Sequence, residues 1–223
     1  KREHEKIEDT IRSVERKSDD KMNVLTNEDI PSRNPYYRYV LEEMCGGITH
    51  KEFQDTKITR SQNAMDYIEW NGGNYKDVSK WMYKQGYTKL AERCIAMYNK
   101  LSEGGNIMRK ICHFPKGTIG AFVGHMPKHL THPDEDRYLT LRECLSIMKL
   151  PKDFELQGGV KNLNHICQNV PVTTAEDMAV HVEKFVDGRL SNQLLDTDFL
   201  IQDNTNHKLN FEKNSVQLDA FMV

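Results

Sequence analysis

Residues 137–151 read RYLTLRECLSIMKLP and carry the strongest local structure signal in this chain of 223 residues. Thr140 and Glu143 have the spacing of a capping box. In that motif the threonine hydroxyl accepts a hydrogen bond from the backbone of the third helical residue, and that residue's carboxylate reaches back to the cap. Apolar residues follow as far as the Leu150-Pro151 pair. The stretch therefore predicts a helix over residues 141–149.

Toward the C-terminus, Thr173 and Glu176 repeat this spacing and predict a second helix over residues 174–187. Gly188 is placed to end it. Its apolar residues share one helical face. That face comprises Met178, Ala179, Val182, Phe185 and Val186. The last 35 residues, 189–223, are polar and weakly patterned, and we expect an irregular tail there.

Toward the N-terminus, helical periodicity appears over residues 88–102 and stops at Gly104-Gly105. Glycines and prolines interrupt short apolar pieces in residues 107–131, a texture typical of strands and loops. A short helix is expected over residues 36–46, and a polar stretch follows it up to Gly72-Gly73.

The first 35 residues give weaker signals. Residues 22–35 read as a linker, because Pro31 and Pro35 break regular structure. Residues 1–20 are mostly charged, with one narrow apolar stripe made of Ile7, Ile11 and Val14. Such a stripe is typical of a solvated helix or of the end of a coiled arm.

Composition indicates a folded, cytoplasmic protein. Hydrophobic residues make up 38% and charged residues 29% of the chain, a balance that favours folding over disorder. No apolar run approaches the roughly 18 residues of a membrane span. The five cysteines are scattered without a CxxC pair, so we expect neither a disulfide framework nor a zinc site, and Cys112-His113 is read as packing. The chain begins Lys1-Arg2, so we expect either processing or a longer chain.

The net charge of −2 is unevenly distributed. Residues 1–106 hold 18 basic and 18 acidic side chains, residues 107–152 hold eight and four, and residues 153–223 hold five and eleven. The basic middle segment also contains His113, His125, His129 and His132. Because cations that neutralise DNA phosphates release counterions, residues 107–152 are a candidate DNA-binding segment. An ordinary mixed surface is the alternative.

Three blocks, in order, resemble motifs of the DNA cytosine-5 methyltransferases. Lys116-Gly117-Thr118-Ile119 resembles the Thr-Ile/Leu signature of the target-recognition region. Residues 137–154 resemble the ninth motif, R-x-L-T-x-R-E followed by a hydrophobic-Pro pair. Residues 166–172, ICQNVPV, resemble the tenth motif, usually I-G-N-[AS]-V-P. The resemblance covers about residues 98–188, and residues 1–97 match no motif of the family.

The resemblance implies a protein that grips double-stranded DNA while a cytosine is flipped into a pocket between two lobes. In the family, a cysteine thiolate of the large lobe adds to the base, and S-adenosylmethionine then donates a methyl group. Thr118, with Lys116 beside it, inherits a contact with the DNA backbone; a β-branched strand residue is the alternative reading of Thr118. Arg137 and Arg142 are the other DNA-binding candidates, although we expect mainly structural, fork-type bonds to carboxylates or carbonyls.

The tenth-motif block implies contact with S-adenosylmethionine through Gln168, Asn169 and Val170. Here the chain departs from the family, because Cys167 stands at the glycine of the motif and Gln168 at its asparagine. Cys167 is not the expected nucleophile, since the family's catalytic cysteine follows a proline and no cysteine here does. The large-lobe signatures Phe-x-Gly-x-Gly, Glu-Asn-Val and Gln-x-Arg-x-Arg are also missing. We therefore expect no catalytic residue and no methyl transfer by this chain alone.

The expected fold class is α+β, with a target-recognition lobe of helices and short strands and C-terminal helices that complete a Rossmann-like methyltransferase lobe. We divide the chain into a charged helix and linker (1–35), the target-recognition region (36–136), the ninth- and tenth-motif helices (137–188) and the tail (189–223). The expected partners are double-stranded DNA and a catalytic methyltransferase lobe or subunit, which would bring S-adenosylmethionine.

Two alternatives remain open. In the first alternative, the chain is a catalytically inert DNA-binding or regulatory protein that descended from such an enzyme. The altered tenth motif favours this hypothesis. In the second, the chain is an unrelated helical interaction domain, a reading that the unmatched residues 1–97 favour. A neighbouring reading frame that encodes the Pro-Cys and Glu-Asn-Val signatures would separate the first hypothesis from both alternatives.

Overall fold

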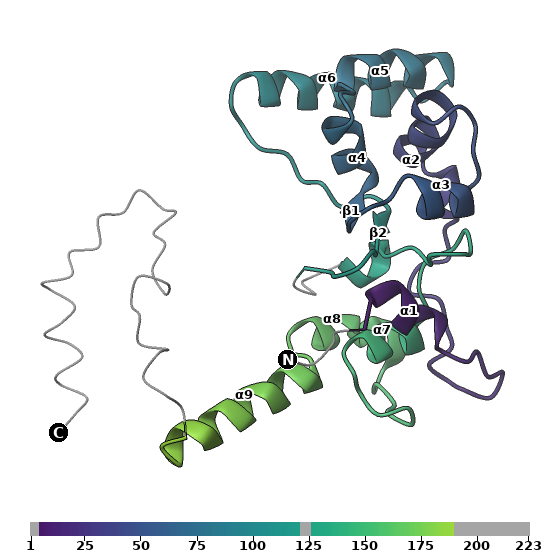
Figure 1. Cartoon of the computed structure of the whole chain (residues 1–223). Coiled ribbons are helices and arrows are strands. Elements are labelled where there is room, and N and C mark those ends of the chain that lie inside the picture. Colours follow the sequence, from purple (N-terminus) through teal and green to yellow (C-terminus); the bar gives the residue numbers. More distant parts are fainter. Residues whose placement is uncertain (1–4, 121–125, 190–223) are drawn as a thin grey trace, which may run out of the picture. The chain divides into compact units, whose positions relative to one another are not determined.

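The computed structural model describes residues 5–120 and 126–189. The chain divides into two units, Lys1–Ala175 and Glu176–Val223. The first unit is mainly helical and contains a two-stranded antiparallel sheet of β1 (Gln62–Asn63) and β2 (His113–Phe114), in which Gln62 lies opposite Phe114 (Figure 1). The expected α+β class is confirmed at this level.

Helices precede, separate and follow the two strands. Before β1 come α1 (Ile7–Arg12), the 3₁₀ helix η1 (Pro31–Arg33), α2 (Pro35–Tyr39), the π-helix η2 (Val40–Met44) and α3 (His50–Thr56). Between the strands come α4 (Ala64–Trp70), α5 (Tyr75–Lys84) and α6 (Thr88–Ser102). After β2 come η3 (Met126–His129), α7 (Leu141–Ile147), η4 (Gly159–Asn162), α8 (Leu163–Cys167) and α9 (Val172–Val186).

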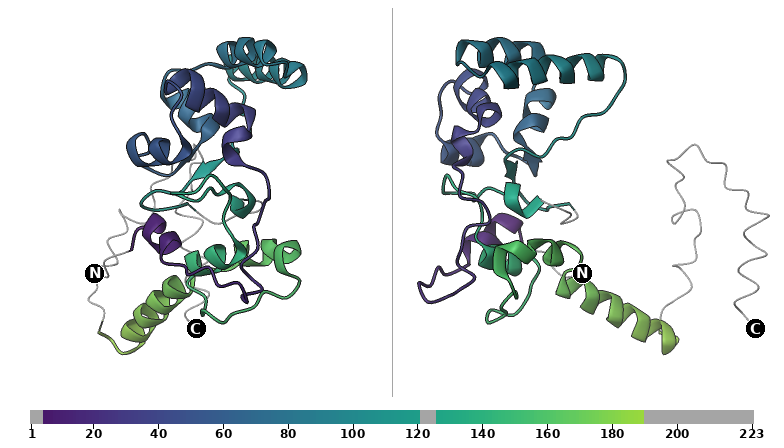
Figure 2. Two further views of the ribbon diagram at one scale, coloured as in Figure 1. Left: turned by 90° about the vertical axis from the view of Figure 1, so that its right-hand side faces the viewer. Right: turned by 180° about the vertical axis from the view of Figure 1, so that it is seen from behind.

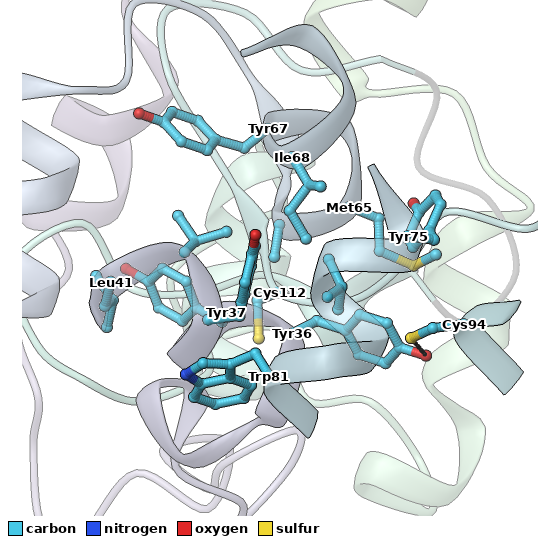
Figure 3. Packing of buried hydrophobic residues seen from close by; sticks show 14 of the residues in the cluster. Tyr36, Tyr37, Leu41, Met65, Tyr67, Ile68, Tyr75, Trp81, Cys94 and Cys112 are labelled. Atoms are coloured by element: carbon cyan, nitrogen blue, oxygen red, sulfur yellow. Dashed lines mark hydrogen bonds between the residues drawn. The ribbon is translucent and has the colours of Figure 1, made fainter. Parts of the chain in front are cut away.

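A first hydrophobic core joins α2 and α4–α6 to β2 and is rich in aromatic residues. The Tyr37 ring lies 5.3 Å from that of Phe53 and 4.8 Å from that of Phe114, measured between centroids. Figure 3 shows Tyr36 of α2 beside Cys94 of α6, where the thiol lies 3.7 Å from the tyrosine hydroxyl. Side chains from segments far apart in sequence therefore fix the helices on one another.

A second core forms where α1 packs on α7 and α8. Ile7 and Ile11 are 8% and 1% exposed, so the expectation of a solvated helix was wrong. The stripe is narrow because α1 has only six residues. A short helix needs few apolar positions to bury its inner face.

Residues 22–30 of the predicted linker contain no helix and no regular strand, but the segment packs on the rest of the first unit. Its first part runs beside the start of α7, where Thr26 N donates to Leu139 O at 2.9 Å. Leu141 N donates to Val24 O and Arg142 N to Met22 O, both at 2.8 Å. The first amide groups of a helix have no partner within the helix. This segment supplies the carbonyl acceptors, a role that no composition rule reveals.

The helices with clear periodicity appear where the sequence predicts them. The segment 88–102 is α6, α7 begins directly after Thr140, and α2 with η2 ends before Gly46 and Gly47, whose φ angles are 76° and 84°. The stretch that we read as polar contains α3 and α4, which the pattern should have revealed. Thr49 and Glu52 form a capping box before α3, as Thr140 and Glu143 do before α7.

The helix α9 runs from Val172 to Val186, and Gly188 follows it with a φ of 65°. Thr173 therefore lies inside the helix, and the predicted capping box with Glu176 was wrong. Pro171 O accepts from Thr174 N at 2.9 Å, so the helix starts at the proline rather than at a threonine cap. The tail beyond Arg189 lies outside the described residues.

Candidate functional site

The block that resembles the ninth motif is folded around the Glu143 carboxylate. Thr140 N donates to Glu143 Oε2 at 2.7 Å, and Glu143 N donates to Thr140 Oγ1 at 3.2 Å. Arg137 adds a fork, with Nη1 at 2.9 Å from Oε2 and Nη2 at 2.8 Å from Oε1. The Glu143 side chain is 1% exposed and that of Arg137 is 12% exposed. One buried carboxylate thus serves both a helix cap and an arginine fork.

Arg142 has a second fork. Its Nε and Nη2 lie 2.6 and 2.9 Å from the two oxygens of Asp20, and its Nη1 donates to Phe154 O at 2.9 Å. The hydrogen bond from Arg142 lowers the pKa of Asp20, because it stabilises the ionised carboxylate. Arg142 therefore ties the N-terminal segment to α7. The guanidinium groups of Arg137 and Arg142 both face carboxylates of this chain, which matches the structural role expected of them.

The Lys116–Ile119 segment is a loop held from two sides. Ser61 Oγ accepts from Lys116 N at 2.8 Å and lies 2.6 Å from Thr118 O, to which it donates. Glu8 Oε2 accepts from Gly117 N at 2.6 Å, and Ile7 N donates to Gly117 O at 2.8 Å. Gly117 has a φ of 66°, a conformation that suits glycine. These anchors fix the backbone and leave the Thr118 side chain exposed.

Lys116 is only half-buried, and its Nζ lies 3.5 Å from Gln54 O. It neighbours Thr118 through a β-bridge of the two residues. Two of the four predicted DNA contacts, Lys116 and Thr118, therefore lie together near the surface. The other two, Arg137 and Arg142, are occupied by internal ion pairs.

The predicted cofactor residues lie on the connection between α8 and α9. Gln168, Asn169 and Val170 are all exposed. The Asn169 amide nitrogen donates to His165 O at 2.5 Å, and its backbone amide donates to Ile166 O at 3.3 Å. A cofactor pocket encloses most of its ligand's surface. Three exposed residues on the connection between α8 and α9 cannot enclose a ligand in this way. Gln168, Asn169 and Val170 by themselves therefore do not form an enclosed pocket.

Half of the basic side chains of residues 107–152 are occupied by ion pairs within the chain. Four of the eight basic side chains form short ion pairs: Arg109 with Glu69 at 2.7 Å, Arg137 with Glu143 at 2.8 Å, Arg142 with Asp20 at 2.6 Å and Lys149 with Glu5 at 2.7 Å. Burial lowers the pKa of His113 to about 4, and burial also lowers that of His132. Both imidazoles are neutral near pH 7. Only about half of the positive charge counted in the sequence therefore lacks a carboxylate partner among the described residues.

The described cysteines are poorly suited to nucleophilic chemistry. Cys94, Cys112 and Cys144 are buried. Burial raises the pKa of the Cys112 thiol to about 12 and also raises that of Cys94, because an apolar environment disfavours the thiolate. Cys45 is half-buried, with its sulfur 3.6 Å from the Tyr67 hydroxyl.

Within residues 5–120 and 126–189, no group of three or more His, Cys, Asp or Glu side chains is arranged to hold a metal ion. No helix in the same ranges combines the length and the apolar character of a membrane span. The chain matches no protein-family model, no curated protein and no solved structure.

Proposed function

We propose that this chain is the DNA-recognition and cofactor-pocket-completing half of a DNA cytosine-5 methyltransferase, inactive without a catalytic lobe. The observation that carries the proposal is the loop at Lys116–Ile119. Its backbone is fixed by Ser61 and Glu8, while Thr118 is an exposed residue. A hydroxyl held on a rigid base is suited to a hydrogen bond with a DNA phosphate.

The ninth-motif block supports the same proposal as a base for that loop. Thr140, Glu143 and Arg137 form a buried network, so the start of α7 is tightly defined. Glu8, which holds Gly117, belongs to α1, and α1 packs on α7. The loop is thus linked to the base through one short helix.

The helix α9 offers the surface for the catalytic lobe. Met178, Val182, Phe185 and Val186 follow the three- and four-residue spacing of one helical face. Their exposed fractions are 60%, 61%, 73% and 76%. Burying one such side chain contributes roughly 1.5–3 kcal/mol, so together they would stabilise a complex. In the proposed enzyme this face packs on the catalytic lobe and completes its Rossmann-like fold.

The cofactor follows from that docking. S-adenosylmethionine would supply the methyl group, and the catalytic lobe would supply most of its pocket. Gln168, Asn169 and Val170 directly precede Pro171 and α9. In the proposed enzyme, these exposed residues contact the cofactor in the pocket that the catalytic lobe provides.

The test is reconstitution. The full chain is incubated with labelled S-adenosylmethionine and mixed-sequence duplex DNA, first alone and then with a catalytic lobe that carries the Pro-Cys and Glu-Asn-Val signatures. We expect label on the DNA only in the second reaction. Methylation by the chain alone would overturn the proposal. DNA binding without docking of any lobe would favour the inert DNA-binding protein instead.

A further inference from the structure

The helices α5 and α6 form a hairpin inserted between β1 and β2. They lie side by side (Figure 2) and are joined by a turn in which Gly86 has a φ of 81°. The inner side is buried and cross-linked, with Ser79 Oγ donating to Ala91 O at 2.9 Å. The inner faces present Tyr75, Val78, Trp81 and Met82 from α5 and Ala91, Cys94 and Met97 from α6.

The outer side of this hairpin is basic. Residues 75–102 contain six Lys or Arg and two Asp or Glu. On α6 the basic residues occupy one helical face, at spacings of four and seven residues: Lys89, Arg93 and Lys100. On α5 they recur every four residues: Lys76, Lys80 and Lys84. All six side chains belong to exposed residues.

Few of these basic side chains form an ion pair with a carboxylate of the chain. In the described ranges only Lys80 of the six forms an ion pair, at 3.0 Å from Asp77. Lys76 Nζ lies 4.2 Å from the centre of the Tyr98 ring, which leaves its charge uncompensated. The contrast with residues 107–152 is clear, because half of the basic side chains there have carboxylate partners. The hairpin therefore concentrates the available positive charge.

We propose that the outer face of α6 binds duplex DNA, with Lys89, Arg93 and Lys100 contacting phosphates. The three residues span eleven positions, about 16 Å along a helix axis. A helix about 10–12 Å across also suits the major groove, which is about 12 Å wide. Charge complementarity selects DNA as the occupant, since three unpaired cations along one face meet a dense row of phosphates.

This inference rests on the proposed function and deepens it. The target-recognition region of residues 36–136 includes the hairpin, so α6 would contact the duplex in addition to Lys116 and Thr118. The Lys116–Ile119 loop and the hairpin are tested by different substitutions. The recognition role can therefore survive if α6 proves not to take part.

The experiment compares the full chain with a variant that carries Lys89→Gln, Arg93→Gln and Lys100→Gln. Affinity for a fluorescent duplex is measured by anisotropy at increasing salt. Each phosphate contact contributes about 0.9 to the slope of log affinity against log salt, so the variant slope should be shallower by about 2.7. The matched control carries Lys57→Gln, Lys161→Gln and Lys184→Gln, which remove the same charge from exposed residues outside the hairpin that also have no ion pair in the described part of the chain. Its slope should equal that of the unmodified chain.

Each outcome decides one statement. If the unmodified chain binds duplex and the hairpin variant has the same slope, the α6 proposal is overturned while the recognition role stands. If the unmodified chain shows no salt-dependent binding, the recognition role fails as well. If the unmodified chain binds poly-L-glutamate more tightly than duplex DNA, the outer face of α6 is better suited to an acidic protein, and the proposal is overturned. Because glutamine favours helices, the three substitutions should leave α6 folded. Equal melting temperatures for the hairpin variant and the control variant would show this.

Discussion

Replacing Glu143 with alanine should destabilise the chain far more than replacing Glu52, the glutamate of the capping box before α3, with alanine. Glu143 is 1% exposed, closes the cap of α7 and holds Arg137 with two bonds of 2.8 and 2.9 Å. Its removal leaves the largely buried guanidinium with only the exposed Glu135 carboxylate, 2.9 Å away, as an ion-pair partner. Leaving a buried charge without any partner costs about 3–5 kcal/mol, so we expect a loss toward the lower end of that range. The free energy of unfolding of an ordinary domain is about 5–15 kcal/mol, so the loss would be a large and measurable share of it.

The matched control is Glu52→Ala. Glu52 makes the equivalent capping box before α3, with Thr49 N at 2.8 Å from its carboxylate, but it is exposed and no arginine contacts it in the described residues. Urea unfolding followed by the fluorescence of Trp70 and Trp81 gives the free energy of unfolding for each variant. Equal losses for Glu143→Ala and Glu52→Ala would refute the idea that the buried arginine fork stabilises the base of the loop.

Three further predictions address binding and pH. Val182→Asp with Phe185→Ser should leave the melting temperature of the isolated chain nearly unchanged while abolishing co-purification with a catalytic lobe; unfolding of the isolated chain would show that the face is core. Thr118→Val should weaken duplex binding by about 1 kcal/mol through one lost hydrogen bond, with no change in the salt slope, because the hydroxyl is uncharged. Burial lowers the pKa of His113 from 6.5 to about 4, so its neutral form contributes stability above pH 6.5 that is lost as the pH falls toward 4. Unfolding measured from pH 7 to 4 should show this loss, and His113→Gln should reduce it.

The helices that the sequence predicted are those whose signals are local. The segment 88–102 needs only the spacing of Leu90, Cys94 and Met97, and α7 needs only a threonine three residues before a glutamate. The same rule read Thr173 wrongly, because Pro171 begins α9 two residues earlier. Thr49 and Glu52 carry the same signal directly before α3. The burial of α1 had no local signal, since its six residues gain their apolar contacts from α7.

The candidate site divides in the same way. The resemblance to family motifs pointed to Lys116–Ile119, Arg137 and Arg142, and helical spacing predicted the apolar face of α9, because motifs and spacing are both read along the chain. Only the tertiary structure decided which charges remain available. Arg142 meets a carboxylate 122 positions away and Lys149 meets one 144 positions away, whereas Lys89, Arg93 and Lys100 have no ion pair in the described residues. A charge counts toward DNA binding only when no carboxylate of its own chain neutralises it. Pairing across such distances depends on how the helices pack, which no count along the sequence contains.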